Sequence, residues 1–128
     1  MSKIISEHYE DELVKWLETI HYYNEEMREL ENKLAEVIQR NTIPHIAEKV
    51  ENEQDKINAI SAIFNRLQEL IVHQEQKIKT DDSLIDDALI NKETANQQDN
   101  LRSQMQAAEK EYIDVKFGCY HFLSDILK

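Results

Sequence analysis

The sequence predicts an all-α fold: an elongated antiparallel up-down-up three-helix bundle with coiled-coil (heptad) packing. Two observations predict it. Ala, Glu, Lys, Leu, Arg, Ile and Gln make up 75 of the 128 residues, whereas Gly and Pro occur once each. Apolar residues recur at alternating spacings of three and four in three stretches, which two short polar breaks separate. This composition and this spacing are typical of long helices that pack along one face.

The first helix is predicted at about residues 6–39. Its seam follows the heptad spacing without a break, through Tyr9, Leu13, Trp16, Ile20, Tyr23, Met27, Leu30, Leu34 and Val37. Leu17 and Ile38 lie beside the seam and widen the apolar stripe, so we expect this helix to contact two neighbours. Acidic and basic residues four positions apart favour ion pairs on the outer face: Asp11 with Lys15, Glu29 with Lys33, and Glu36 with Arg40.

The second helix is predicted at about residues 43–79, after a break at 40–44. Thr42 can cap this helix, and Pro44 is tolerated only in a first turn. The seam passes through Ile43, Ile46, Val50, Glu53, Ile57, Ile60, Phe64, Leu67, Ile71, Gln74 and Ile78. Because the connection is short, we expect the first two helices to be antiparallel neighbours.

The third helix is predicted at about residues 84–127, where Ser83 and Asp86 resemble a capping box. Its seam is clear from Leu101 through Met105, Ala108, Tyr112, Val115, Cys119, Phe122 and Ile126, and continues backward through the polar residues Gln98, Thr94 and Asn91. Two interpretations stay open. The helix is continuous or kinked, which we favour because no strong helix breaker lies near Asn91, or a short helix at 84–90 precedes a break around 91–94.

Polar residues interrupt the second and third seams at Glu53, Gln74, Asn91 and Gln98. A buried polar side chain can fix the register of packed helices at a cost in stability. Alternatively, the rod is open to water at these points. We favour both effects together over a ligand site.

The charge and composition exclude several classes of function. The formal net charge is −11, and no segment offers a basic patch, so we expect no binding to nucleic acid or to anionic membranes. The longest apolar run has three residues, which predicts no membrane span. The single Gly excludes glycine-rich phosphate loops. One cysteine and no signal-peptide pattern at the start favour the cytoplasm.

We expect no catalytic residue, no cofactor and no metal ligand set. Glu18 and His21 have the spacing of a di-iron motif, but both fall on the outer face, as do His8, His45, His73 and His121. Glu69 and His73 are most simply a surface pair. Cys119 lies on the third seam and is most simply a small buried apolar residue. Neither His45 nor His73 is followed by the Lys and small residue typical of phosphotransfer bundles.

Four segments carry a resemblance to a known family: Trp16-Leu17, the stretch 30–37, Asn41-Thr42 and Val50-Glu51. Over about residues 10–78 the chain resembles an uncharacterised family of small helical bacterial proteins. The resemblance implies a bacterial, cytoplasmic, coiled-coil-type protein, and it carries over no catalytic residue.

These observations predict a non-enzymatic helical scaffold or adaptor that binds another protein or forms a homodimer. The expected contact surface is the stripe with Leu17 and Ile38, or the off-seam aromatic residues Tyr22 and Tyr120. Two alternatives stay open. One is a metal-binding or histidine-phosphotransfer bundle. The other is an acidic chaperone or inhibitor of a basic client protein, whose complex would weaken steeply with salt.

Overall fold

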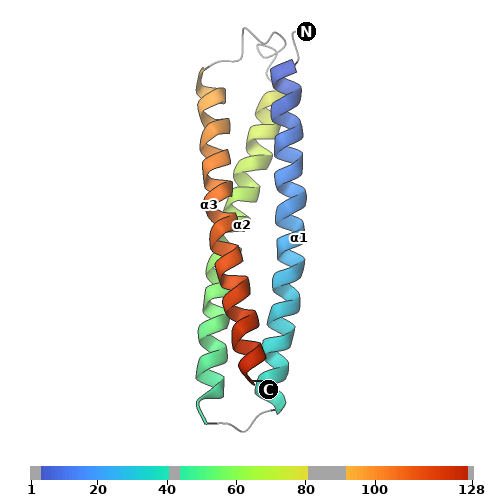
Figure 1. The fold of residues 1–128 in the computed structure, drawn as a ribbon. Coiled ribbons are helices and arrows are strands. Elements are labelled where there is room, and N and C mark those ends of the chain that lie inside the picture. Colours follow the sequence, from blue (N-terminus) through green and yellow to red (C-terminus); the bar gives the residue numbers. More distant parts are fainter. Residues whose placement is uncertain (1–3, 41–43, 81–91, 127–128) are drawn as a thin grey trace.

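The computed structural model describes residues 4–40, 44–80 and 92–126, which form three long helices. They are α1 (Ile4–Arg40), α2 (Ile46–Thr80) and α3 (Lys92–Ile126). Figure 1 shows α1 and α3 running in one direction and α2 in the other, side by side in an elongated rod. The predicted fold class, an up-down-up three-helix bundle, is confirmed.

The ends of the helices differ from the predicted ones where local backbone geometry intervenes. Helix α2 begins at Ile46, three residues after the predicted start, because His45 has a left-handed φ of 68°. The His45 carbonyl accepts a hydrogen bond from the Lys49 amide (3.1 Å), which is the first helical bond of α2. Thr42, the Ser83–Asp86 cap and the question of a break near Asn91 lie outside the described residues.

The predicted seams form the core. In α1, all nine seam residues are buried or half-buried. In α2, every described seam residue is buried except Glu53, which is partly exposed. In α3, the seam from Thr94 to Ile126 is buried or half-buried, and Leu123 joins it although the predicted seam omits it. A chain that repeats apolar residues every 3.5 positions thus buries one face of each helix against the other two.

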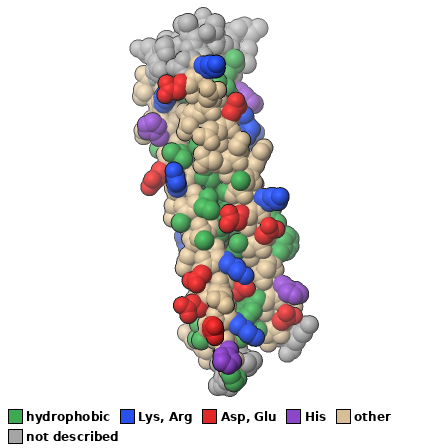
Figure 2. All heavy atoms as spheres, turned by 90° about the vertical axis from the view of Figure 1, so that its left-hand side faces the viewer, with side chains coloured by type: hydrophobic (Ala, Val, Ile, Leu, Met, Phe, Trp, Pro, Cys, Tyr) green, Lys and Arg blue, Asp and Glu red, His purple; other side chains and the backbone are tan. Residues whose placement is uncertain are grey.

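Helix α2 packs closely against both α1 and α3. The backbones of α1 and α3 make much less contact with each other. Long polar side chains bridge α1 and α3 instead. On one face of the rod, hydrophobic side chains follow the middle of the surface, with charges of both signs around them (Figure 2). Within the described residues, no helix has the length and apolar character needed to cross a membrane.

Candidate functional site

The four residues predicted to contact a partner lie on two different sides of the bundle. Tyr22 (57% exposed) and Tyr120 (39% exposed) both border the seam between α1 and α3, and each influences the same Glu26–Lys116 pair. Leu17 packs against the core, and Ile38 is exposed. At ~100° per residue, Leu17 and Ile38 project ~140–160° away from Tyr22 around the helix axis. The structure therefore brings together Tyr22 and Tyr120, and it separates them from Leu17 and Ile38.

A carboxylate of α1 is clamped by two side chains of α3 near one end of the rod. Glu12 accepts hydrogen bonds from Gln98 Nε2 (2.9 Å) and from two nitrogens of Arg102 (2.7 and 2.8 Å). Asp99 accepts a further bond from Arg102 (2.7 Å). Burial opposes ionisation of Glu12, but the bonds from Arg102 and Gln98 outweigh it and hold the Glu12 pKa below its usual value.

The same arrangement recurs two heptads further along both helices. Glu26 accepts hydrogen bonds from the Tyr112 hydroxyl (2.7 Å) and from Lys116 Nζ (2.8 Å). Glu26 also loses solvation, yet its pKa is lowered because Lys116, Tyr112 and Tyr22 donate hydrogen bonds to it. Burial and the Glu26 carboxylate raise the pKa of Tyr112 far above its usual value. We call these two sets the Glu12 clamp (Glu12, Gln98, Arg102) and the Glu26 clamp (Glu26, Tyr112, Lys116).

An aromatic layer fills the core beside the Glu26 clamp. The ring centroid of Tyr23 lies 4.4 Å from that of Tyr112 and 5.5 Å from that of Phe64, so all three helices meet here. The Tyr23 hydroxyl donates to Glu109 on α3 (3.0 Å). Burial and the Glu109 carboxylate raise the Tyr23 pKa to about 12. The two tyrosine hydroxyls thus remain protonated at neutral pH and act as donors across the seam.

The clamp pattern ends one heptad later, and a groove opens between α1 and α3. Lys33 occupies the position of α1 equivalent to Glu12 and Glu26, and its α3 counterparts are Cys119 and Leu123 in place of polar donors. The Lys33 ammonium lies 5.6 Å from the centroid of the Tyr120 ring. The groove has a volume of about 560 Å³ and is lined by Lys33, Glu36, Val37, Arg40, Tyr120, Leu123 and Ser124.

The predicted ion pairs on the outer face of α1 are wrong. Within the described part of the chain, neither Lys33 nor Arg40 forms an ion pair within 4.0 Å, and Asp11 and Lys15 form none with each other. Exposed pairs of this kind contribute little free energy, so spacing alone does not decide their geometry. Lys33 instead lies over the Tyr120 ring.

Two exposed apolar residues off the predicted seam continue from the groove along α3. Ile113 is 44% exposed and Phe117 is 65% exposed, and with Tyr120 they occupy one side of the helix. Phe117 is an aromatic residue off the seam, as Tyr22 and Tyr120 are, so the same signal could have identified it, whereas Ile113 lies off the seam without being aromatic. We call Tyr22, Ile113, Phe117, Tyr120 and the adjoining groove the α1/α3 face.

The polar seam residues of α2 and α3 form a buried hydrogen-bond network. Gln74 Nε2 donates to Gln98 Oε1 (3.1 Å) and to the Thr94 carbonyl (3.2 Å), while Gln98 Nε2 donates to Glu12 and to the Tyr9 carbonyl. Gln74 and Gln98 are fully buried, which agrees with a role in fixing the register. Glu53 differs from them: its Oε1 lies 3.7 Å from Lys56. Its Oε2 is buried without a hydrogen-bond partner among the described residues.

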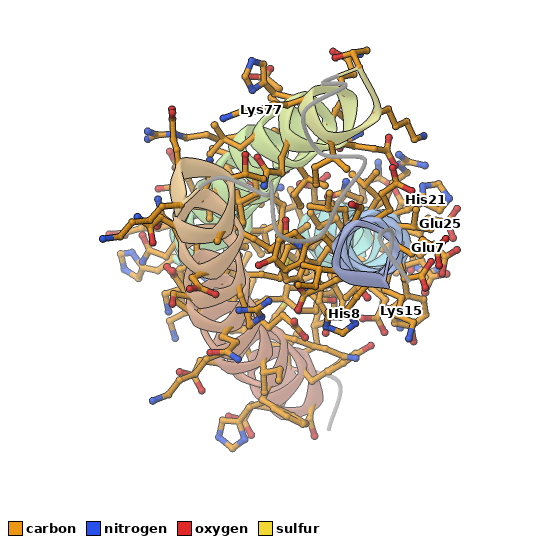
Figure 3. All side chains as sticks on the ribbon, turned by 90° about the horizontal axis from the view of Figure 1, so that it is seen from above. Glu7, His8, Lys15, His21, Glu25 and Lys77 are labelled. Carbon is orange, nitrogen blue, oxygen red and sulfur yellow. The ribbon has the colours of Figure 1, made fainter. Side chains whose placement is uncertain are left out.

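The histidines lie on the outside of the bundle, as predicted. All five are exposed, and His21, for example, pairs with Glu25 at 3.2 Å. Viewed along the rod, His8 and His21 project away from its centre (Figure 3). Cys119 is fully buried, and burial, with a contribution from Glu53, raises the pKa of its thiol to about 11. Among the residues that the structure describes, no three His, Cys, Asp or Glu side chains gather as metal ligands would.

No family model, no curated protein and no solved structure matches the chain. This outcome agrees with a resemblance that carries over no known activity. Among the described residues, the α1/α3 face is the surface with exposed aromatic side chains beside a groove.

We expect the bundle to lose stability in acid, because the two clamps need the ionised carboxylates of Glu12 and Glu26. Because the pKa values of Glu12 and Glu26 are lowered by folding, their contribution is complete above the carboxyl pKa of the unfolded chain, ~4.3. It is lost as the pH falls through the lower values of the folded state. Thermal melts from pH 7 to pH 2 should show that acid lowers the Tm of the Glu12→Gln/Glu26→Gln variant less than that of the wild type. Equal drops in both proteins would contradict this assignment.

Proposed function

We propose that this chain is a non-enzymatic helical scaffold or adaptor of the bacterial cytoplasm, which acts by binding protein through the α1/α3 face. The observation that carries the proposal is the exposure of Phe117, Ile113 and Tyr22 on neighbouring helices beside an apolar groove. Large apolar side chains that gather at one surface are typical of contact sites, whereas isolated ones are ordinary. Aromatic residues in particular supply much of the binding energy at protein interfaces.

The mechanism is recognition of one helical surface by another. Apolar side chains of the α1/α3 face would pack against a partner, and the surrounding charges would exclude partners of the wrong charge pattern. The clamps support this mechanism because they hold α1 and α3 at a fixed offset, which presents the face as a rigid surface. Coiled-coil packing of the three seams would provide the supporting scaffold.

The test compares capture by matched variants from an extract of cells that produce the protein. The tagged wild type, an Ile113→Ser/Phe117→Ser variant and an Ile63→Ser control are used, because Ile63 is 38% exposed on α2, away from the face. We expect the same protein to be retained by wild type and control and lost by the double variant. Retention by all three would overturn the proposal. Loss of the complex in high salt for all three would favour the acidic chaperone instead.

A further inference from the structure

The apolar part of the α1/α3 face is arranged symmetrically about Phe117. Ile113 lies four residues before Phe117 and Tyr120 lies three residues after it, so one helix turn on each side carries an exposed apolar side chain. Phe117 is also the most exposed of the large apolar residues described. A surface with this arrangement can cover itself when two copies pack antiparallel, with Phe117 near the two-fold axis.

The charges that border this face also suit a second copy. From Glu26 onward, acidic residues precede basic ones along the flank of α1: Glu26 and Glu29 come first, and Lys33 and Arg40 follow. Lys15 is a cation that lies before them on the same side of the helix. Glu36 is the one acid between the two cations, and it lines the groove with them. The chain as a whole has a net charge of −11, so most of its surface would repel another copy. On this flank, opposite charges are separated along the helix between Glu26 and Arg40.

The offset between α1 and α3 shows which charges would meet. Side chains of α1 contact side chains of α3 that lie 86 to 90 positions later. Phe117 is therefore level with residues 27–31 of α1. A two-fold axis at that level places Lys33 opposite residues 21–29 of the second copy, a stretch that carries Glu25, Glu26 and Glu29 and the single Arg28. Antiparallel pairing thus brings the basic part of one copy to the acidic part of the other.

The groove gives this pairing an apolar anchor. Residues 14–22 of the second copy would lie level with Arg40, at the end of the groove formed by Val37 and Leu123. Tyr22 is 57% exposed and belongs to that stretch. Its ring fits the character of the groove, which combines apolar walls with the cations Lys33 and Arg40, because an aromatic face attracts a cation.

We propose that the α1/α3 face is a homodimer interface in which two copies of this chain pack antiparallel across Phe117. The inference rests on the proposed function, since it names a second copy as the protein that the face binds. Each interface residue would occur twice, so a single substitution changes the contact at two places.

Sedimentation over ~1 to 500 µM protein tests the proposal, with thermal melts to show that each variant folds. We expect a wild-type dimer, a Kd raised at least ~10-fold by Phe117→Ser or by Lys33→Glu, and a Kd unchanged within ~2-fold for the controls Ile63→Ser and Lys49→Glu, which both lie on α2. Glu25→Lys/Glu29→Lys should restore the dimer of the Lys33→Glu variant. Glu26 is left unchanged because it belongs to a clamp.

Two results would overturn the dimer. One is a monomeric wild type over the whole concentration range. The other is a dimer whose Kd does not respond to Phe117→Ser and Lys33→Glu, which would place the contact elsewhere. A monomeric wild type that still captures a different protein through Ile113 and Phe117 would leave the proposed function intact. Capture of the same protein by the wild type and by the Ile113→Ser/Phe117→Ser variant would count against the proposed function itself.

Discussion

Ile60→Asp should abolish the cooperative thermal transition of this bundle. Ile60 has no exposed surface and belongs to the core where α2 meets its neighbours. The substitution loses the burial of an apolar side chain, ~2 kcal/mol, and places a carboxylate in the hydrophobic core, which costs several kcal/mol more. The sum is comparable with the whole stability of a domain of this size, ~5–15 kcal/mol.

The matched control is Ile63→Asp, three residues later on the same helix. Ile63 is 38% exposed, so the new carboxylate stays in water and we expect a melting curve close to that of the wild type. Circular dichroism at 222 nm, a wavelength that reports helix content, would follow both transitions. A normal cooperative melt for Ile60→Asp would contradict the burial of the α2 seam in the core.

Glu26→Ala should destabilise the bundle by ~2–3 kcal/mol, or a fall in Tm of ~10 °C. Removing the carboxylate leaves the buried Tyr112 hydroxyl without its acceptor and Lys116 without its partner. The neighbouring Glu25→Ala is the control, because Glu25 is exposed and its pair with His21 lies on the surface, where such pairs contribute ~0–1 kcal/mol.

A double-mutant cycle with Tyr112→Phe separates the hydrogen bond from other effects. In the Tyr112→Phe background no hydroxyl is orphaned, so Glu26→Ala should cost less than in the wild type. Chemical unfolding at pH 7 gives the four free energies. Additive effects of the two substitutions would show that Glu26 does not act through Tyr112.

The course of the seams could be predicted from the sequence because burial follows the spacing of apolar residues. Leu13, Phe64 and Leu101 are examples, each predicted on a seam and each fully buried. Spacing identifies the buried face of a helix, but it does not identify the residue on the next helix that faces it. The partners of Glu12 and Glu26 therefore could not be predicted, since they depend on the offset between α1 and α3.

The candidate site was predicted in part, for the same physical reason. Tyr22 and Tyr120 are aromatic residues off the seam, and the structure places both at the α1/α3 face. Leu17 and Ile38 were selected because they widen the apolar stripe, yet they lie on the other flank of α1. The groove depends on what stands opposite Lys33, where Leu123 replaces the cation that the clamps use. The residue opposite Lys33 can be identified only once α1 and α3 are aligned in space.

The spacing of the two clamps also rules out a misalignment that the apolar seams alone would permit. Sliding α3 by one heptad along α1 would return apolar residues to apolar positions. Suppose that each residue of α1 met the residue of α3 seven positions after its present partner. Glu12 would then face Met105 and Glu109, and Glu26 would face Cys119 and Leu123. Both carboxylates would lose every donor they now have, and Glu12 would meet another acid. The chain thus has one alignment of α1 and α3 that satisfies both carboxylates, and a mistake by a single heptad is penalised at two places at once.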